Sequence, residues 1–139
     1  LTAWLRALPW RKVVVLHANH PNEIDAAVVT ALGALRDAGA LLLNQSVLLR
    51  GVNDDATTLA ALSRRLLDAG ALPYYLHLPD AVRGTAHFDV PATEARGLVA
   101  ALARELPGYL VPRLVREVPG EAAKTVLAAG IVPAADPIM

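Results

Sequence analysis

The sequence predicts an α/β fold, in which the strands of a parallel sheet alternate with helices in the order βαβαβαβ. The first observation is composition: 55% of the 139 residues are hydrophobic and 19% are charged, which suits a sheet buried on both faces. The second is a short internal sequence repeat: Leu35–Leu41 and Leu66–Leu72 match at an offset of 31 residues. That offset is close to the length of one strand–helix unit, so each copy ends a helix and begins a strand.

The four predicted strands are apolar runs that follow a turn or a helix end, and they cover residues 12–16, 41–43, the middle of 70–80, and 109–115. Three consecutive valines make the first run typical of a strand. The second is expected to end around residues 44–46, where polar side chains begin. We expect residues 1–127 to form one domain and residues 128–139, rich in Ala and Pro, to form a loose tail.

The predicted helices carry apolar residues at helical spacing, and they cover residues 1–8, 22–38, about 54–69 and 92–106. Asn22 or Asp25 can cap the second of these helices, and Asn53 or Asp54 can cap the third. Gly39 supplies the left-handed residue that ends the second helix. Helices between successive strands make the strands parallel and the connections right-handed.

Such a chain forms either a doubly wound sheet or part of a (β/α) barrel, and in both the ligands bind at the carboxyl ends of the strands. Polar side chains follow every predicted strand, and these are His17, Asn19 and His20; Asn44, Gln45 and Ser46; His77 and Asp80; Arg116 and Glu117, with Lys124 beyond. Because parallel strands end at the same edge of a sheet, we expect these groups to converge.

Several kinds of site remain open for this edge. Each polar residue can simply cap a helix or satisfy the backbone of a turn. His17, His20, His77 and Asp80 are residue types that bind metals, as in metal-dependent barrel hydrolases. Lys124 can form a Schiff base with a carbonyl cofactor. A Walker phosphate loop is excluded, because Ala123 stands where the glycine before the lysine is required.

Other function classes find no support in the composition. The net charge is zero and no basic cluster stands out, so neither a nucleic acid nor an anionic membrane is indicated as a partner. No apolar run reaches the length of about 18 residues that a membrane span needs. The chain has no cysteine, which excludes disulfides and thiolate metal sites. A cytoplasmic location is therefore expected.

Motifs spread from Lys12 to Thr125 resemble the lysine 2,3-aminomutase family, which are radical S-adenosylmethionine (SAM) enzymes that also use pyridoxal phosphate. The motifs are His17–Glu23, Leu43–Asp54, Pro73–Tyr75 with Asp80, Gly84 and His87–Phe88, Gly108–Pro112, and Pro119–Thr125. They occur in the family's order and with similar spacing. The resemblance implies that the chain is the carboxyl-terminal part of a TIM-like (β/α) barrel of the radical SAM type.

The resemblance also implies roles for individual residues. Lys124 would form the Schiff base with pyridoxal phosphate, and His17 and Gln45 would contact SAM. Asp80 and Glu117 would bind the side-chain ammonium of the substrate L-lysine, because a buried cation needs its charge matched and its donors filled. In the family, an iron–sulfur cluster cleaves SAM to a radical, and the amino group of lysine migrates from C2 to C3.

The sequence departs from the family in places that matter. The Cys-x-x-x-Cys-x-x-Cys motif for the [4Fe–4S] cluster is missing, so we expect the cluster ligands upstream of Leu1 and no activity from this segment alone. Glu117 in place of the commoner aspartate, and Val126 in place of proline, are closer to the branch that makes (R)-β-lysine for elongation factor P. A non-catalytic binding or assembly module is the alternative. A homo-oligomer is expected.

Overall fold

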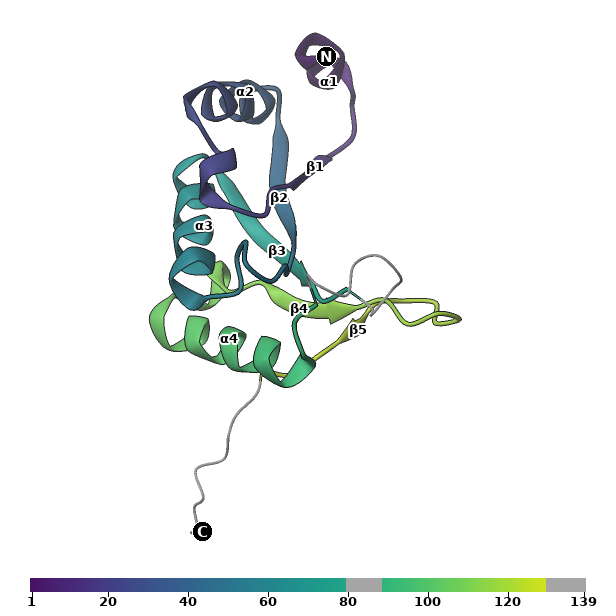
Figure 1. Ribbon diagram of the computed structural model, residues 1–139. Coiled ribbons are helices and arrows are strands. Elements are labelled where there is room, and N and C mark those ends of the chain that lie inside the picture. Colours follow the sequence, from purple (N-terminus) through teal and green to yellow (C-terminus); the bar gives the residue numbers. More distant parts are fainter. Residues whose placement is uncertain (80–88, 130–139) are drawn as a thin grey trace.

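The computed structural model describes residues 1–79 and 89–129. Its elements, shown in Figure 1, are α1 (Thr2–Ala7), β1 (Lys12–His17), the 3₁₀ turn η1 (Pro21–Glu23), α2 (Ala26–Asp37), β2 (Ala40–Val47), α3 (Ala56–Asp68), β3 (Ala71–His77), α4 (Ala92–Glu105), the 3₁₀ turn η3 (Gly108–Leu110), β4 (Arg113–Arg116) and β5 (Thr125–Val126). None of the helices in the described ranges is long and apolar enough to cross a membrane.

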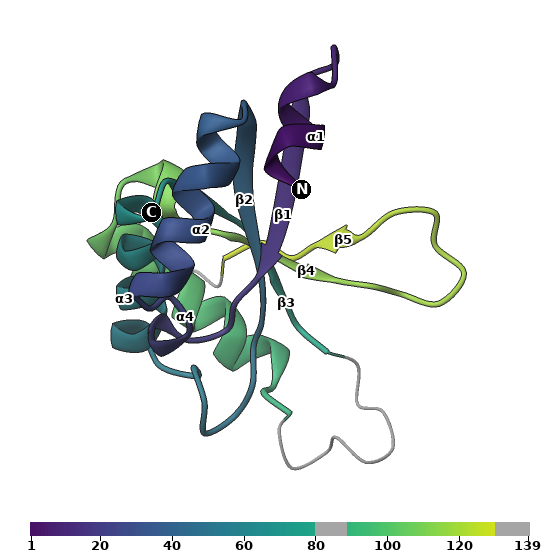
Figure 2. The same cartoon turned by 90° about the horizontal axis from the view of Figure 1, so that it is seen from above.

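The strands form one sheet in the order β1-β2-β3-β4-β5. The pairs β1–β2, β2–β3 and β3–β4 are parallel, and only β5 runs antiparallel to its neighbour β4. Each parallel strand is therefore added on the same side of the strand before it, and α2, α3 and α4 all lie on one face of the sheet (Figure 2). That is the winding of a (β/α) barrel, because a doubly wound sheet reverses its strand order and has helices on both faces.

The hydrophobic core lies between the sheet and these helices. Leu42 of β2 and Leu66 of α3 belong to one cluster of buried residues, and Leu76 of β3 and Leu102 of α4 belong to a second. The opposite face of the sheet is open in the described part of the chain: Leu41, next to the buried Leu42, is 53% exposed. The expectation of a sheet buried on both faces is thus wrong here, because helices cover only one side of strands that are apolar on both.

A β-bulge interrupts the pairing of β2 with β3. Asn44 pairs with Pro73, whereas the next residue, Gln45, pairs with Tyr75, so Tyr74 has no partner in the register. Pro73 has no N–H to donate, which makes it a natural place for the ladder to slip. Neighbouring side chains of a regular strand point to opposite faces, yet the rings of Tyr74 and Tyr75 stack with their centroids 3.9 Å apart. The bulge thus brings the two tyrosines side by side.

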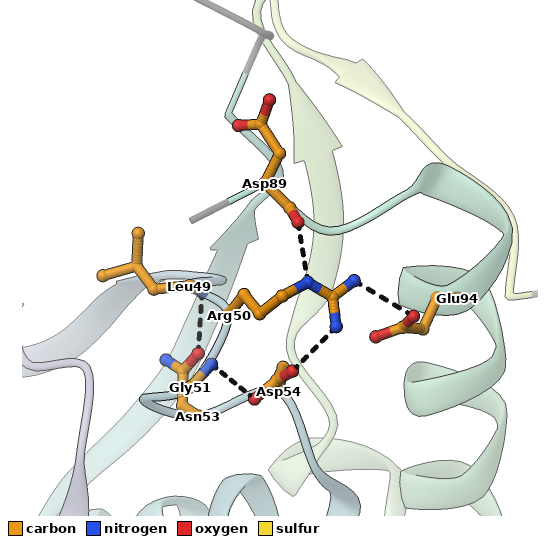
Figure 3. A network of polar contacts seen from close by, with 7 residues as sticks. All are labelled: Leu49, Arg50, Gly51, Asn53, Asp54, Asp89 and Glu94. Carbon is orange, nitrogen blue, oxygen red and sulfur yellow. Dashed lines mark hydrogen bonds and ion pairs between the residues drawn. The ribbon is translucent and has the colours of Figure 1, made fainter. Parts of the chain in front are cut away.

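The loop between β2 and α3 explains one wrong prediction. The side chain of Asn53 accepts a hydrogen bond from the N–H of Leu49, and Asp54 accepts one from the N–H of Gly51 (Figure 3). Both predicted caps are therefore used inside the turn, and it is Asp55 that caps α3. At α2 one of the two candidates is confirmed, since the carboxylate of Asp25 accepts from the N–H of Val28.

Arg50 fastens this loop to the segment that precedes α4. Its guanidinium donates to the carbonyl of Asp89 at 3.0 Å and pairs with Asp54 at 3.3 Å and Glu94 at 3.2 Å (Figure 3). The helix predicted to follow Pro91 is confirmed as α4. Arg50 thus holds the end of β2 and the start of α4 together at the rim of the sheet.

The fourth strand and its surroundings differ from the prediction over residues 109–115. Residues 108–110 form η3, and β4 covers only Arg113–Arg116. Pro112 lies between the two and, lacking an N–H, cannot extend the ladder. The short strand β5 was not predicted, because two residues show no periodicity. It pairs Thr125 with Arg116, so βαβαβαβ describes β1 to β4 and β5 is an addition.

Candidate active site

Polar residues at the carboxyl ends of β1 and β2 are mostly structural. The side chain of Asn44 accepts from the N–H of Ala18 at 2.9 Å and donates to its carbonyl at 3.1 Å, and the Ser46 hydroxyl donates to the same carbonyl at 2.9 Å. Asn19 accepts from the N–H of Val47 at 2.8 Å. Asn44 and Ser46 are buried. Their hydrogen-bonding groups are used by backbone, as the simpler interpretation of these residues expects.

His20 has a similar role in the loop after β1. Its Nδ1 accepts from the N–H of Asn22, while the Glu23 carboxylate accepts from the N–H of His20, which together cap η1. Among residues 1–79 and 89–129, no three or more His, Asp or Glu side chains gather as metal ligands would. Asp80, the fourth residue of the metal hypothesis, lies outside the described residues.

A second group of polar residues faces a cavity on the open side of the sheet. His17 of β1 lies beside Gln45 of β2 in the register, and His77 of β3 follows Tyr75, the partner of Gln45, by two residues. The His77 Nε2 lies 3.0 Å from Gln45 Oε1. An amide oxygen can only accept, so Nε2 is the donor. The cavity has a volume of about 440 Å³ and is lined by His17, Gln45, Val47, His77, Leu78, Pro79 and Glu117.

Glu117 connects this cavity with Lys124. Its Oε1 lies 3.2 Å from Lys124 Nζ, and the ammonium also lies over the ring of Tyr75, 5.6 Å from its centroid. Both Glu117 and Lys124 line a further cavity of about 370 Å³, formed by residues 117–119 and 121–124. The pairing of Arg116 with Thr125 explains this geometry: it brings the ends of the 117–124 loop together, which places Glu117 beside Lys124.

The charges of Lys124 and Glu117 act on His77, the histidine that bonds to Gln45. Burial lowers the pKa of His77, and the neighbouring Lys124 ammonium lowers it further, while the Glu117 carboxylate opposes the shift. His17 adds a smaller lowering effect. The site therefore favours a neutral His77 and couples its protonation to the charges of Lys124 and Glu117.

Four of the five site residues expected from the sequence thus meet at one rim: His17, Gln45, Glu117 and Lys124. The fifth, Asp80, lies outside the described residues. The sequence did not predict the roles of two further participants. His77 was expected at this edge of the sheet and was considered as a metal ligand, but not as a partner of Gln45. Tyr75 was considered only as part of a motif. The available signal was their spacing, since residues two apart in a strand face the same side.

The fold and this rim define a class of protein. Parallel strands wound as in a barrel, with polar side chains and cavities at their carboxyl ends, are typical of α/β enzymes that bind small molecules there. No protein-family profile matches the chain. Among solved structures, a radical SAM methyltransferase from Sphaerobacter thermophilus aligns with a TM-score of 0.54 at 16% identity, over 84% of this chain and 38% of that one. This likeness supports the predicted fold class.

Curated relatives identify the sequence more closely. L-lysine 2,3-aminomutase of Escherichia coli K12 is 54% identical over 115 residues, which are 83% of this chain and 34% of that protein. The enzymes of the same name are 51% identical in Haemophilus influenzae, over 84% of this chain and 34% of that protein, and 40% identical in Clostridium subterminale, over 78% and 26%. The resemblance to the lysine 2,3-aminomutase family is thereby confirmed. The chain spans about a third of the length of these first relatives.

Proposed function

We propose that this chain supplies part of the active site of a lysine 2,3-aminomutase, an isomerase that moves the amino group of L-lysine from C2 to C3. The observation that carries the proposal is the meeting of His17, Gln45, Glu117 and Lys124 at one rim. Because the chain spans about a third of its relatives, the activity is proposed for the whole protein. It stays a prediction that the product is (R)-β-lysine for the modification of elongation factor P. The homo-oligomeric state and the cytoplasmic location also stay predictions.

Lys124 fits the role of the lysine that binds pyridoxal phosphate. The sequence has two lysines, Lys12 and Lys124. The ammonium of Lys12 donates to the carbonyls of Leu5 at 2.9 Å and Ala38 at 3.1 Å, so it is engaged in joining α1 to the end of α2. Lys124 borders a cavity and has 30% of its side chain exposed. When bound, pyridoxal phosphate supplies an aldehyde that condenses with amines and stabilises reactive centres next to nitrogen.

Glu117 fits the role of a carboxylate for the substrate ammonium. It lines both cavities, and charge-assisted bonds from an ammonium to a carboxylate are among the stronger hydrogen bonds. The same carboxylate now pairs with Lys124. We infer that Glu117 becomes available to the substrate when the Lys124 amine is engaged elsewhere. Asp80 is proposed as the second carboxylate. The residue before it in the sequence, Pro79, lines the same cavity as Glu117.

His17 and Gln45 are proposed as contacts of SAM, because both present polar groups to the cavity of about 440 Å³. Gln45 is oriented by its hydrogen bond with His77. The chain's own residues do not fit a [4Fe–4S] cluster held by cysteines, since the sequence contains none. No step involving the cluster is therefore assigned to residues of this chain.

The test uses the two lysines as a matched pair. The protein is incubated with pyridoxal phosphate, reduced with borohydride, and the modified lysine is located by mass spectrometry. We expect modification at Lys124, its loss in Lys124→Met, and no change in Lys12→Met. Equal modification of both lysines in the wild type, or none at Lys124, would contradict the cofactor assignment. Formation of β-lysine by the whole protein, with cluster, SAM and pyridoxal phosphate, then tests the reaction itself.

A further inference from the structure

The ring of Tyr75 is held from several directions on the open face of the sheet. It stacks on Tyr74 with an interplanar angle of 27°, and the two hydroxyls lie 3.2 Å apart. Its other ring contact is edge-on with His77, at 5.8 Å between centroids. The Lys124 ammonium lies over this fixed ring. Tyr75 thus offers a cation a preformed aromatic face.

We propose that Tyr75 is a positioning residue, whose ring holds the Lys124 ammonium at the rim where the two cavities meet. The proposal rests on the proposed function of Lys124 as the cofactor lysine. The side chain of lysine is a flexible four-carbon stem that needs fixed contacts to occupy one position. Glu117 alone is a poor anchor, because its side chain is 72% exposed and solvent-exposed ion pairs are weak. The ring of Tyr75 is the second contact.

The β-bulge between β2 and β3 is what makes this arrangement possible. In a regular strand Tyr74 and Tyr75 would face opposite sides of the sheet, and neither could support the other. The slipped register at Asn44 and Pro73 turns both rings to one side. Bulges next to active sites often redirect a side chain in this way. The bulge therefore places the stacked rings of Tyr74 and Tyr75 next to the Lys124 ammonium.

The first experiment measures where the Lys124 amine lies, without any cofactor. In the whole protein the lysines are methylated reductively with ¹³C-formaldehyde, which preserves their charge, and the Lys124 signal is assigned as the one missing in Lys124→Arg. We expect a ring-current shift to high field for Lys124, retained in Tyr75→Phe and lost in Tyr75→Leu. The Lys12 signal reports whether each variant is folded. A wild-type Lys124 signal without a high-field shift would overturn the proposal, whatever the variants do.

The second experiment asks whether the position matters for the cofactor. Trapping with pyridoxal phosphate and borohydride should modify Lys124 about two- to fivefold less in Tyr75→Leu, the range expected for losing a partly exposed cation–π contact. Tyr75→Phe should trap like the wild type, and so should Tyr109→Leu, which changes an exposed tyrosine. Unchanged trapping in Tyr75→Leu would refute the positioning role. Absence of trapping in every protein, with the ring-current shift intact, would refute the cofactor assignment instead.

Discussion

The two halves of the rim use polar residues in opposite ways. At the ends of β1 and β2, the side chains of Asn19 and Asn44 form their hydrogen bonds with backbone groups. At the end of β3 and in the loop between β4 and β5, His77, Glu117 and Lys124 interact with other side chains and line cavities. Polar residues at strand ends therefore do not all indicate a ligand site. What separates the halves is whether the donors and acceptors are already used by the backbone.

This comparison predicts that the half of the rim with Asn19, Asn44 and Asn53, here called the asparagine half, determines stability. The half with His77, Glu117 and Lys124, here called the charged half, determines binding. His17 and Gln45 mark the boundary, because they lie on strands of the first half yet line the cavity of the second, and Gln45 also bonds to His77.

Asn53→Ala is expected to cost the most stability. The Asn53 side chain is fully buried, accepts from the N–H of Leu49 and donates to the carbonyls of Asn19 and Val47. Its removal leaves three partly buried backbone groups without these partners, at a cost of about 3 kcal/mol in the free energy of unfolding. Urea denaturation measures this cost. Glu117→Gln is the control from the other half, and a loss as large as that of Asn53→Ala there would break the division.

Glu117→Gln is expected to weaken substrate binding while leaving the fold intact. The variant keeps the size of the side chain but removes one of the two proposed charges around the lysine ammonium. The loss of one charge-assisted hydrogen bond corresponds to roughly tenfold weaker binding. The KM for L-lysine of the whole protein measures it, with Glu121→Gln as a control on the same loop. A KM that is unchanged in Glu117→Gln would exclude this carboxylate from the lysine site.

How far the sequence could predict this rim depends on the range of the interactions involved. The convergence of His17, Gln45 and Glu117 followed from parallel topology, because strands that run the same way end at the same edge. Lys124 reaches this edge through the pairing of β5 with β4. For Asn44 the sequence left the choice between a backbone partner and a ligand open, because its partner is Ala18, 26 residues away. No local pattern distinguishes an asparagine that binds backbone from one that binds a ligand.

The places where the prediction failed are irregular. The bulge at Pro73 reverses the alternation on which the side-chain directions depend, so Tyr75 was not recognised as a support for Lys124. The two-residue strand β5 is too short to show a period, yet it sets the distance between Glu117 and Lys124. Strong patterns predicted the regular elements, and the site depends on two departures from regularity that such patterns cannot show.

The smallest predicted effect concerns the pH dependence of the charged half. Burial and the Lys124 ammonium lower the pKa of His77 below its ordinary value of 6.5. The unfolded chain then binds the proton more readily, so the stability contributed by neutral His77 is present above pH 6.5 and declines as the pH falls below it. His77→Gln, which keeps an amide able to bond with Gln45, should remove this decline in a series of urea titrations.

The same histidine reports the charges around it. NMR titration should show the pKa of His77 rising in Lys124→Met, because a nearby cation is lost, and falling in Glu117→Gln, because a nearby anion is lost. Lys12→Met changes the second lysine of these 139 residues and should change nothing at His77. If Lys124→Met left the pKa of His77 unchanged, the two side chains would not share a site. The coupling of β3 with the loop after β4, on which the charged half depends, would then be wrong.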